Sequence, residues 1–423
     1  MVRRNWAANP DWVREDPKLR QLEALPVVLP HTRRLADNIA IEPAGILFVL
    51  GPRQAGKSTF LRQFVQKALA EGLPPERIGL IESESLDSRH DLHAEIRDFC
   101  AKHEGYSLLL IDEVTALEKW WLALKLAADE GALARSLLIC TGSSSLALSE
   151  GADLLPGRRG RRYPVDFELL PVSYHDVAEH LSIDEFLLTG GFPWPVAEFL
   201  RTGALPSFVY ELYRAWIQGA LVKRNHSVQY LGALMNYLGE RTGTGISVAG
   251  LARDCGIGSN HTAEAYLEVL EMNYVVMPCR WSEPDARAAS PRKNRKFYPL
   301  DPFLYHLFHD FTRSPDSAFI NSRERCSDPA RLGVLVESLV ASELRRSPGM
   351  FPLRYFRGRK EIDFVGESAV EVKYRNHVDI RDFLWASEHV PRGMDITIIT
   401  KQTRSRTGNL RAVPLRDWLL GDR

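Results

Sequence analysis

The sequence predicts an α/β protein that begins with a parallel sheet, continues with helices and ends with a helix followed by strands. Three observations predict this fold class. A short apolar run ends at a glycine-rich loop and is followed by a helical stretch. Two further apolar runs end in acidic or hydroxyl residues, as buried parallel strands do at a functional edge. Near the C-terminus, a helix precedes two adjacent strands. These strands carry two acids at corresponding positions and a lysine on the same face as the second acid.

The first of these features has the pattern of a phosphate-binding loop. The run Ile46–Leu50 is followed by Gly-Pro-Arg-Gln-Ala-Gly-Lys-Ser, the pattern G-x-x-x-x-G-K-S, and then by apolar residues at helical spacing. The glycines let successive N–H groups point at phosphate oxygens, and the helix start adds its positive dipole end. We expect the lysine to reach the β and γ phosphates and the serine to bind Mg²⁺. The predicted ATP-binding residues are Gly51, Pro52, Arg53, Gln54, Ala55, Gly56, Lys57, Ser58 and Thr59.

A second apolar strand, residues 108–111, runs directly into two acids, Asp112 and Glu113. A strand that ends in an acid places a carboxylate beside the phosphate loop at the carboxyl edge of the sheet. Asp112 is predicted to hold Mg²⁺ through water, together with Ser58. Glu113 is predicted to polarise the attacking water as a general base. The plainer interpretation is an ordinary strand end with two solvated acids.

A third apolar strand, residues 136–140, ends in Thr141-Gly-Ser-Ser-Ser. Ser143 is predicted to contact the γ phosphate or to position water, although serines at such a site can equally cap the next helix. A segment with four arginines in five residues follows, and Arg158 is the predicted arginine finger for the γ phosphate of a neighbouring subunit. These arginines could instead bind nucleic-acid phosphates or simply be solvated.

Together these segments resemble a known family. The loop that begins at Gly51, the strand with Asp112 and Glu113, the hydroxyl cluster, and Leu155-Pro-Gly-Arg look like the prokaryotic AAA-type ATPases that end in a poorly characterised C-terminal domain. Leu169-Leu-Pro-Val-Ser-Tyr and Gly190-Gly-Phe-Pro look like later segments of that family. The resemblance covers roughly residues 36–423. It implies an ATPase that forms a homo-oligomer, a ring such as a hexamer, because the arginine of the Gly-Arg segment acts between subunits.

The middle of the chain has a helix–turn–helix pattern followed by a strand. Leu251 and Ala252 are expected to face a core, Gly256 to make the turn, and Ser259 to cap the second helix. A winged helix of this kind can dock in the DNA major groove, but this second helix carries three glutamates and no basic residue. A role as a linker or subunit contact is therefore the favoured interpretation. The stretch 280–296, with six basic and two acidic residues, is expected to form a wing or loop that can touch a phosphate backbone.

The C-terminal strands carry Asp363, Glu371 and Lys373, and the preceding helix carries Glu337. Glu371 and Lys373 are two apart and so share one face of a strand. Two acids and a lysine on one face can hold a divalent metal and orient a water for phosphodiester attack. Asp363 and Glu371 are the predicted metal ligands, and all three residues are predicted to be catalytic. The alternative is an ion-pair patch on an exposed strand surface.

This C-terminal set resembles the PD-(D/E)XK nuclease superfamily, through Ile362-Asp, a short gap, and Glu371-Val-Lys. That resemblance implies Mg²⁺, a mixed sheet flanked by helices, and nucleic-acid cleavage. The predicted domains are an N-terminal extension (1–35), an AAA-type ATPase domain (36–200), a helical and winged-helix segment (201–300) and a nuclease-like domain (301–423).

Composition narrows the class of protein further. The chain has 423 residues, 54 basic and 54 acidic side chains and 45% hydrophobic residues, which excludes a disordered protein. No apolar run is long enough for a membrane helix, and the five cysteines lie too far apart for a zinc site or a disulfide framework, so a cytoplasmic protein is expected. Residues 1–276 hold 28 basic and 35 acidic side chains, which leaves a balance of +7 for residues 277–423.

The resulting hypothesis is an ATP-driven protein that acts on DNA, such as a helicase or branch-migration ATPase, whose C-terminal domain binds or cuts DNA. The basic balance of residues 277–423 is consistent with a polyanion partner, although it is also within ordinary surface variation. The alternative is a nucleotide-dependent signalling switch with an inactive nuclease-like domain that contacts protein.

Overall fold

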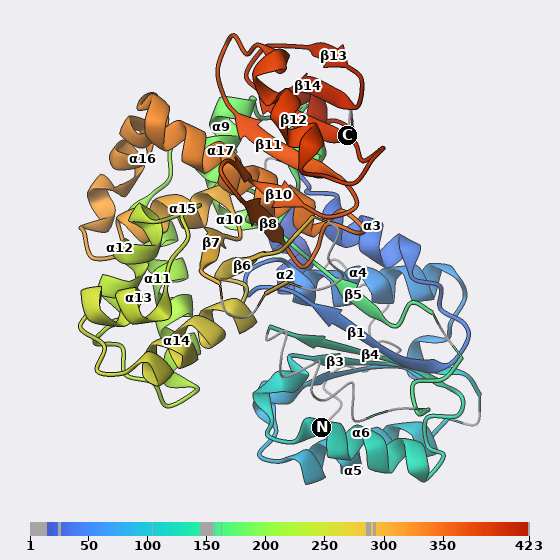
Figure 1. Cartoon of the computed structure of the whole chain (residues 1–423). Helices are drawn as coiled ribbons and strands as arrows, with labels where there is room; N and C mark the ends of the chain where they lie inside the picture. Colours follow the sequence, from blue (N-terminus) through green and yellow to red (C-terminus); the bar gives the residue numbers. More distant parts are fainter. Residues whose placement is uncertain are drawn as a thin grey trace. The chain divides into compact units, whose positions relative to one another are not determined.

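The computed structural model describes residues 15–23, 27–103, 105–143, 155, 157–161, 163–284, 289–290 and 293–421. The chain divides into two compact units (Figure 1). The first comprises Met1–Pro171 with Met272–Tyr274, and the second comprises Val172–Glu271 with Val275–Arg423. The domain boundary expected after residue 200 therefore falls inside the second unit.

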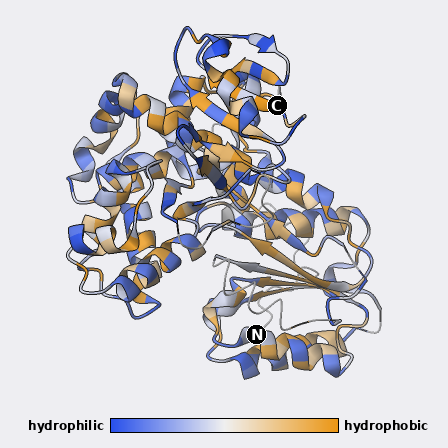
Figure 2. Cartoon of the chain, viewed as in Figure 1, coloured by the Kyte–Doolittle hydropathy of each residue, from blue (hydrophilic) through white to orange (hydrophobic). Residues whose placement is uncertain are grey.

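The first unit is built on a five-stranded parallel sheet in the order β2-β3-β4-β1-β5. Its strands are β1 (Gly45–Leu50), β2 (Ile78–Glu82), β3 (Ser107–Asp112), β4 (Ser136–Gly142) and β5 (Asp166–Glu168). Its helices are α2 (Pro17–Glu23), α3 (His31–Asn38), α4 (Lys57–Ala70), α5 (Arg89–Ala101) and α6 (Trp120–Asp129). The central strands are strongly apolar along their whole length (Figure 2), as expected for strands buried on both faces.

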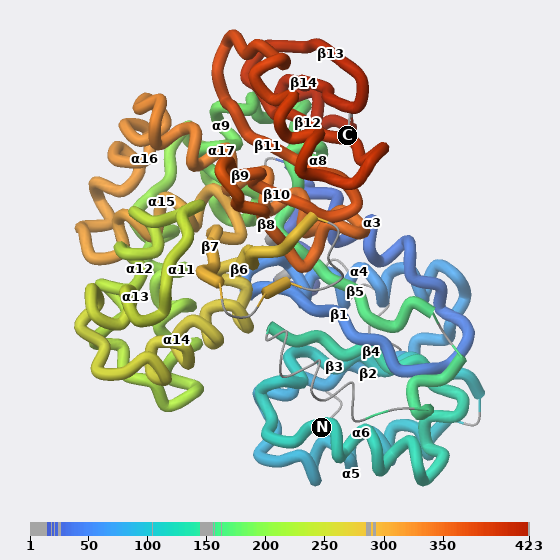
Figure 3. Tube along the Cα trace, in the orientation of Figure 1, coloured from blue at the N-terminus to red at the C-terminus, as the bar shows by residue number. Residues whose placement is uncertain are grey.

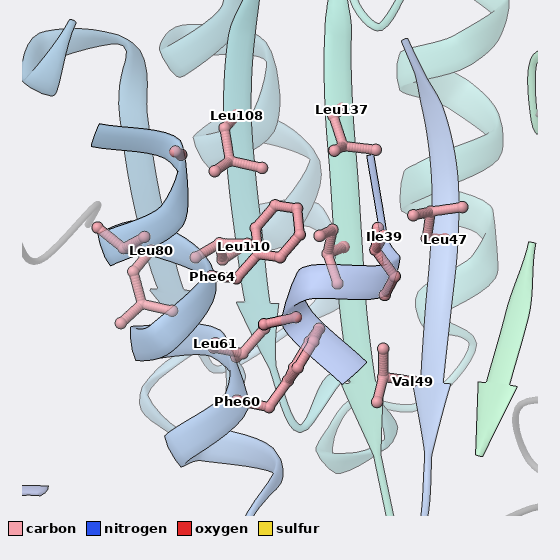
Figure 4. Packing of buried hydrophobic residues seen from close by; sticks show 14 of the residues in the cluster. Ile39, Leu47, Val49, Phe60, Leu61, Phe64, Leu80, Leu108, Leu110 and Leu137 are labelled. Atoms are coloured by element: carbon pink, nitrogen blue, oxygen red, sulfur yellow. The ribbon is translucent and has the colours of Figure 1, made fainter. Parts of the chain in front are cut away.

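Alternate residues of each strand enter two separate cores, because successive side chains of a strand point to opposite faces. Leu47 and Val49 pack with Phe60 and Phe64 of α4 on one face (Figure 4). Their neighbours in β1 pack on the other face with α5 and α6, where Trp120 is 1% exposed. The two layers of helices thus fix the carboxyl ends of the strands, which is where the phosphate loop and the acids lie.

Part of the predicted N-terminal extension packs on this unit. Lys67 of α4 donates to the carbonyls of Ala36, Asp37 and Ile39 at 2.7–3.1 Å, which holds α3 against α4. Asp16, just before α2, is buried and its Oδ2 lies 3.6 Å from Nε of Arg62. Residues 1–14 and 24–26 of the predicted extension lie outside the described residues.

The second unit begins with a series of helices. They are α8 (Tyr174–Val177), α9 (Ile183–Thr189), α10 (Pro193–Thr202), α11 (Ser207–Val222), α12 (Leu231–Glu240), α13 (Val248–Asp254) and α14 (Asn260–Met272). The Gly190-Gly191 pair is required here: Gly190 has φ +62°, and a Cβ on it would lie 1.9 Å from Oδ1 of Asp301. Asp301 accepts from the N–H of Gly191 at 2.7 Å and caps α15 (Pro302–His309).

The predicted helix–turn–helix segment corresponds to α13 and α14. Leu251 and Ala252 are buried. Gly256 has φ +69° in the turn, a backbone conformation that glycine adopts readily because it has no Cβ. Ser259 accepts from the N–H of Thr262 at 3.0 Å at the start of α14. The antiparallel strands β6 (Val276–Trp281) and β7 (Arg295–Pro299) follow, and Ile246 forms a single bridge with Arg295.

The last part of the second unit carries a four-stranded and a five-stranded sheet, in the orders β7-β6-β8-β9 and β10-β11-β12-β14-β13. Its helices are α16 (Ala318–Ser327), α17 (Pro329–Arg345) and α18 (Leu415–Leu419), with a 3-10 segment over Ile380–Glu388. Its strands are β8 (Arg354–Arg357), β9 (Glu361–Ile362), β10 (Phe364–Val365), β11 (Ala369–Lys373), β12 (Ile396–Thr400), β13 (Ser405–Thr407) and β14 (Leu410–Pro414). Strand β6 pairs in parallel with β8, which joins the middle of the chain to its C-terminal part (Figure 3).

Candidate functional site

The phosphate loop connects β1 to α4 and is shaped by its glycines. A Cβ on Gly51 would lie 2.1 Å from the carbonyl oxygen of Leu169. Gly56 has φ +99° immediately before α4, a conformation that favours glycine. Nε2 of His31 lies 2.9 Å from the carbonyl oxygen of Ala55 and supports the loop from outside. The loop is thus a preformed backbone turn at the N-terminus of a helix, the arrangement that binds phosphate groups.

Lys57 lies across this loop. Its Nζ donates to the carbonyls of Gly51 and Pro52, at 2.8 Å each. Burial lowers the pKa of Lys57, although the nearby charges of Glu113 and Asp112 oppose this shift. The ammonium group is therefore poorly solvated and is held by neutral carbonyls, so phosphate oxygens are well suited to replace them as acceptors.

Asp112 and Glu113 lie at the end of β3 and are joined by Thr141 from the end of β4. The Thr141 hydroxyl donates to Oδ1 of Asp112 at 2.8 Å and accepts from the Glu113 N–H at 2.9 Å. Oδ2 of Asp112 lies 3.6 Å from Nη1 of Arg62, which also donates to the carbonyl of Ser58 at 2.9 Å. The structure thus brings the two predicted acids to the start of α4, beside Ser58.

Glu113 is held by three hydrogen bonds that all fall on Oε1. The donors are the Thr115 hydroxyl at 2.6 Å, the Ser143 hydroxyl at 2.7 Å and the Ser143 N–H at 3.1 Å. Burial tends to raise the pKa of Glu113, but the charge of Lys57 and these hydrogen bonds lower it overall. Glu113 is therefore ionised at neutral pH, with Oε2 outside the three bonds and in a position to accept a proton.

The residues present fit Mg²⁺ at this site. Ser58 is the second residue of α4, and the Asp112 carboxylate is only 13% exposed and is fixed by Thr141. A hydroxyl oxygen from the start of the helix and a carboxylate at the end of another strand of the same sheet are the donor set that P-loop enzymes use for this ion. Ser58 and Asp112 would hold the ion, which would supply positive charge to stabilise the negative charge on the phosphates.

Arg158 does not lie with these residues in the described chain. Its Nε and Nη2 donate to the carboxylate of Asp129, at the end of α6, at 2.5 and 3.2 Å. Neighbouring Arg159 pairs with Asp166 and lies 4.7 Å from the ring centroid of Phe48. Ser144 and Ser145 of the predicted hydroxyl cluster, and Arg162 of the arginine segment, lie outside the described residues.

In the second unit, the C-terminal acids form a buried cluster. Asp363 and Glu371 are 6% and 5% exposed, so the alternative of a solvated surface patch is wrong. The Asp363 N–H donates to Oε2 of Glu371 at 3.2 Å, and the Val372 N–H donates to Oδ2 of Asp363 at 2.9 Å. Lys373 donates to Oε1 of Glu371 at 2.6 Å. The structure therefore unites all three predicted residues at one place.

A residue that the sequence did not reveal lies among these carboxylates. Nζ of Lys296, on β7, is 2.5 Å from Glu361, 3.6 Å from Glu337 and 3.9 Å from Asp363. Lys296 is 1% exposed and lies on a strand, so the expectation that the stretch 280–296 forms a wing or loop that can touch a phosphate backbone does not hold for this residue. The sequence did not predict the burial of Lys296, because this residue belongs to a run of basic residues, and such a run favours an exposed loop.

The electrostatics of the cluster reflect an excess of acids. Burial and the charge of Asp363 raise the pKa of Glu371 to about 8 and that of Glu337 to about 7. Burial disfavours the charged form of Lys296, but the charges of Glu337, Asp363 and Glu361 raise its pKa above the ordinary value. The cluster thus shares protons among its carboxyl groups and keeps its lysines charged.

The residues as arranged do not fit the divalent metal that the nuclease resemblance implies. Within the described parts of the chain, no group of three or more His, Cys, Asp or Glu side chains is arranged to hold a metal ion. The ammonium of Lys296 lies within 4 Å of Glu337, Glu361 and Asp363, so it competes with a metal ion for these carboxylates.

All five cysteines are free thiols. None of the helices in the described ranges combines the length and apolar character that a membrane-spanning helix needs.

Comparisons with known proteins cover two adjacent parts of the chain. Residues 44–178 match the family model described as AAA domain, and residues 180–314 match a domain of unknown function (DUF8612). Glu337, Asp363, Glu371 and Lys373 lie beyond both matches. A comparison with curated proteins found no match.

Several solved structures are distantly similar. A Walker-type ATPase of Pyrococcus abyssi has 18% identity over 68% of this chain and 96% of its own, with a TM-score of 0.44. The ORC1 protein of Aeropyrum pernix, solved in complex with DNA, has 15% identity over 78% of this chain and 98% of its own, with a TM-score of 0.36. A RuvB variant of Thermotoga maritima has 15% identity over 63% of this chain and 90% of its own, with a TM-score of 0.31.

The family match coincides with the part of the chain that carries the phosphate loop on β1, the acids at the end of β3 and the hydroxyls at the end of β4. The arrangement of these residues is compatible with a nucleoside triphosphate as ligand. Residues 44–178 are therefore an AAA domain of the P-loop ATPase class.

Proposed function

We propose that the protein hydrolyses ATP and uses the turnover to act on DNA, as a motor or remodeller such as a helicase or branch-migration ATPase. One observation carries the hydrolytic part: Thr141 and Ser143 hold Asp112 and Glu113 at the edge of the sheet, beside the phosphate loop. A site that only binds nucleotide needs no ionised carboxylate fixed in this way, whereas hydrolysis needs a group that orients and deprotonates water.

The phosphate loop and the residues that follow β3 and β4 have distinct roles in this proposal. The backbone N–H groups of residues 53–57 cradle the phosphates, and Lys57 leaves its two carbonyl partners to bind the β and γ phosphates. Oε2 of Glu113 accepts the proton of the attacking water while Oε1 stays fixed by Thr115 and Ser143. Ser58 and Asp112 hold the magnesium ion.

We further propose that the protein works as a homo-oligomer, a ring such as a hexamer. In the described chain Arg158 is bound to Asp129, at the surface. The Arg158 guanidinium, which pairs with the exposed carboxylate of Asp129, can exchange that carboxylate for a γ phosphate bound in a neighbouring subunit, because arginine forms strong charge-assisted hydrogen bonds with phosphate as well as with carboxylate. Arg158 would then complete the active site of its neighbour.

The DNA part of the proposal rests on charge. Residues 277–423 carry a balance of +7, and two basic segments within them, residues 280–296 and 354–360, lie on the paired strands β6 and β8 or adjoin them. The order α12, α13, α14 and the β6–β7 hairpin matches that of a winged helix, whose hairpin connection is a common phosphate contact. The acidic face of α14 argues for contact through this hairpin and not through the helix.

ATP turnover measured with and without single-stranded, duplex and branched DNA tests this function. Stimulation by at least one of these DNAs, together with salt-sensitive DNA binding, is the expected result. The Lys57→Ala variant is the control and loses nucleotide binding. Turnover that no DNA changes, in a sample that is oligomeric and binds ATP, rejects the DNA part of the proposal.

A second candidate function is favoured by Lys296. A carboxylate cluster that already holds an ammonium group suits an inactive nuclease-like fold in a nucleotide-dependent switch whose C-terminal part contacts protein. The two candidates differ in whether DNA changes ATP turnover. Turnover that no DNA changes, together with no cleavage in the presence of Mg²⁺, supports the switch. Cleavage by wild type that Asp363→Ala or Lys373→Ala abolishes rejects the inactive nuclease-like fold.

A further inference from the structure

The second unit contains a cavity of about 320 Å³ beside the carboxylate cluster and separate from it. It is lined by Gly245, Trp281, Lys293, Asn294, Tyr355 and Arg357. These residues come from three parts of the chain that the pairing of β6 with β8 brings together, with Trp281 and Tyr355 as register partners. Side chains at paired positions of neighbouring strands project to the same face of a sheet. Two aromatic and two cationic side chains therefore share one cavity.

The aromatic part of the cavity is rigidly built. The indole N–H of Trp281 donates to the carbonyl of Arg357 at 3.3 Å, and the Trp281 ring lies 6.5 Å from that of buried Phe356. The Tyr355 hydroxyl donates to the carbonyl of Asn294 at 2.8 Å. Trp281 is thus fixed by the sheet while its ring still lines the cavity, which is the situation of an aromatic stacking platform.

The cationic part is loosely held in comparison. Nζ of Lys293 lies 5.2 Å from the ring centroid of Trp281, and Lys293 is otherwise exposed. The Arg357 side chain is 66% exposed, and its Nε is 3.8 Å from Oε2 of Glu361, a weak surface pair. Both cationic side chains can therefore reorient to bind an anionic ligand, because they lose only weak contacts when they do so.

We propose that this cavity binds one nucleotide of single-stranded DNA. The base stacks on Trp281 in place of the Lys293 ammonium, and Lys293 and Arg357 bind the flanking phosphates. Single-stranded DNA fits because a base in a duplex has both of its faces covered, whereas an unpaired base offers a free π-face. This inference rests on the proposed action on DNA and assigns it a contact site.

Gly245 provides a direct way to test the cavity. A Cβ at this position would lie 3.5 Å from Cβ of Asn294 and 3.6 Å from the Tyr355 hydroxyl, which is ordinary contact. Gly245→Gln therefore fills the mouth of the cavity without a clash. Gly258→Gln is the matched control, because a Cβ on Gly258 meets no atom within 4 Å. Neither glycine has a φ that excludes other residues.

The experiment uses the full chain carrying Lys57→Ala, so that nucleotide binding plays no part, and a labelled oligothymidylate of about 12 nucleotides. Fluorescence anisotropy at low salt should show binding. Trp281→Ala should weaken it roughly 5- to 100-fold, since stacking of one base is worth about 1–3 kcal/mol, and Trp281→Phe should restore part of the loss. Gly245→Gln should also weaken binding, and Gly258→Gln should not.

Two further probes separate stacking from charge alone. An abasic strand of equal length keeps every phosphate but has no base, so it should bind more weakly than oligothymidylate. Lys293→Ala and Arg357→Ala should each lower the salt dependence by about one released counterion. Equal binding of the abasic strand, or unchanged binding by both Trp281→Ala and Gly245→Gln, overturns the proposal. Tighter binding of oligouridylate than of oligothymidylate overturns the assignment to DNA.

The outcomes also distinguish this site from the proposed function. If Trp281→Ala loses oligonucleotide binding while no DNA alters ATP turnover in otherwise wild-type protein, the cavity stands and the motor proposal fails. If DNA stimulates turnover but the cavity variants bind like wild type, the motor proposal stands and this site is wrong. Unfolding temperature, measured for each variant, shows whether a loss of binding reflects a loss of fold.

Discussion

The hydroxyl oxygen of Ser143 lies 2.7 Å from Oε1 of Glu113, thirty residues earlier in the chain. This bond joins the ends of two neighbouring parallel strands and orients the carboxylate that we assign to water activation. It also favours the ionised form of Glu113, because a hydrogen bond donated to a carboxylate stabilises its charge.

Replacing Ser143 therefore tests whether this bond matters for hydrolysis. Ser143→Ala removes the hydroxyl but keeps the backbone N–H bond, so turnover should fall about tenfold with ATP affinity retained. The pKa of Glu113 should rise, which moves the acidic limb of the pH–rate profile to higher pH. An unchanged profile would show that Ser143 does not act through Glu113.

Glu113→Gln should keep ATP binding and trap the nucleotide. Glutamine has the same shape and still accepts from Thr115 and Ser143 through an oxygen, but it cannot take a proton. Turnover should drop by roughly 100-fold or more, as expected for loss of a general base. Single-turnover hydrolysis and retained ATP measure the two effects. Exposed Glu118→Gln is the control, and normal hydrolysis by Glu113→Gln would remove the assignment.

Arg158→Ala should lose turnover by roughly 1,000-fold while nucleotide affinity is retained, if this arginine completes a neighbouring site. Exposed Arg161→Ala should have little effect. Mixing Arg158→Ala with Lys57→Ala subunits should restore part of the activity, because one interface in the mixture then has both residues. If Arg158 serves only its pair with Asp129, neither the loss nor the restoration will be seen.

The carboxylate cluster should make stability depend on pH in a defined direction. The pKa of Glu371 is about 8 in the folded chain against an ordinary value of 4.5. Between these values the folded state binds more protons than the unfolded state, so the free energy of unfolding falls as pH rises and levels off above the folded pKa. Its contribution is greatest below the unfolded pKa.

Glu371→Gln should flatten this dependence. The difference in unfolding free energy between about pH 5 and about pH 8 should shrink by roughly 2–4 kcal/mol, measured by denaturant unfolding. Glu367→Gln, at a nearby exposed position, should leave the slope as in wild type. Identical slopes for Glu371→Gln and wild type would show that the carboxyl group is not buried against Asp363.

Lys296→Met should destabilise the chain by roughly 3–5 kcal/mol at about pH 8, because it leaves buried carboxylates without their cation. The loss should be smaller at about pH 5, where the carboxyl groups can protonate instead. Lys360→Met, at an exposed position on the same unit, is the control. A loss that is equal at both pH values would mean that Lys296 contributes packing and not charge.

The nucleotide site could be predicted from the sequence because it is made of contiguous segments. A glycine-rich loop after an apolar strand can only form a turn at a helix start, and acids that directly follow another buried parallel strand reach the same edge of the sheet. Lys57, Asp112, Glu113 and Ser143 are placed in this way by the order of elements alone. The sequence also predicted that the C-terminal strands form a hairpin. Asp363 and Glu371 are only eight residues apart, so such a hairpin brings them together.

Only the tertiary structure decided which residues contact one another across long separations. Thr141 joins the two acids, Arg158 faces Asp129, and Lys296 enters the carboxylate cluster from a strand that the sequence pattern assigned to a basic loop. The cavity at Trp281 exists because β6 pairs with β8, whose register partners lie 74 positions later in the chain. Local periodicity determines elements and strand ends, but the partner of a buried charge depends on how those elements pack.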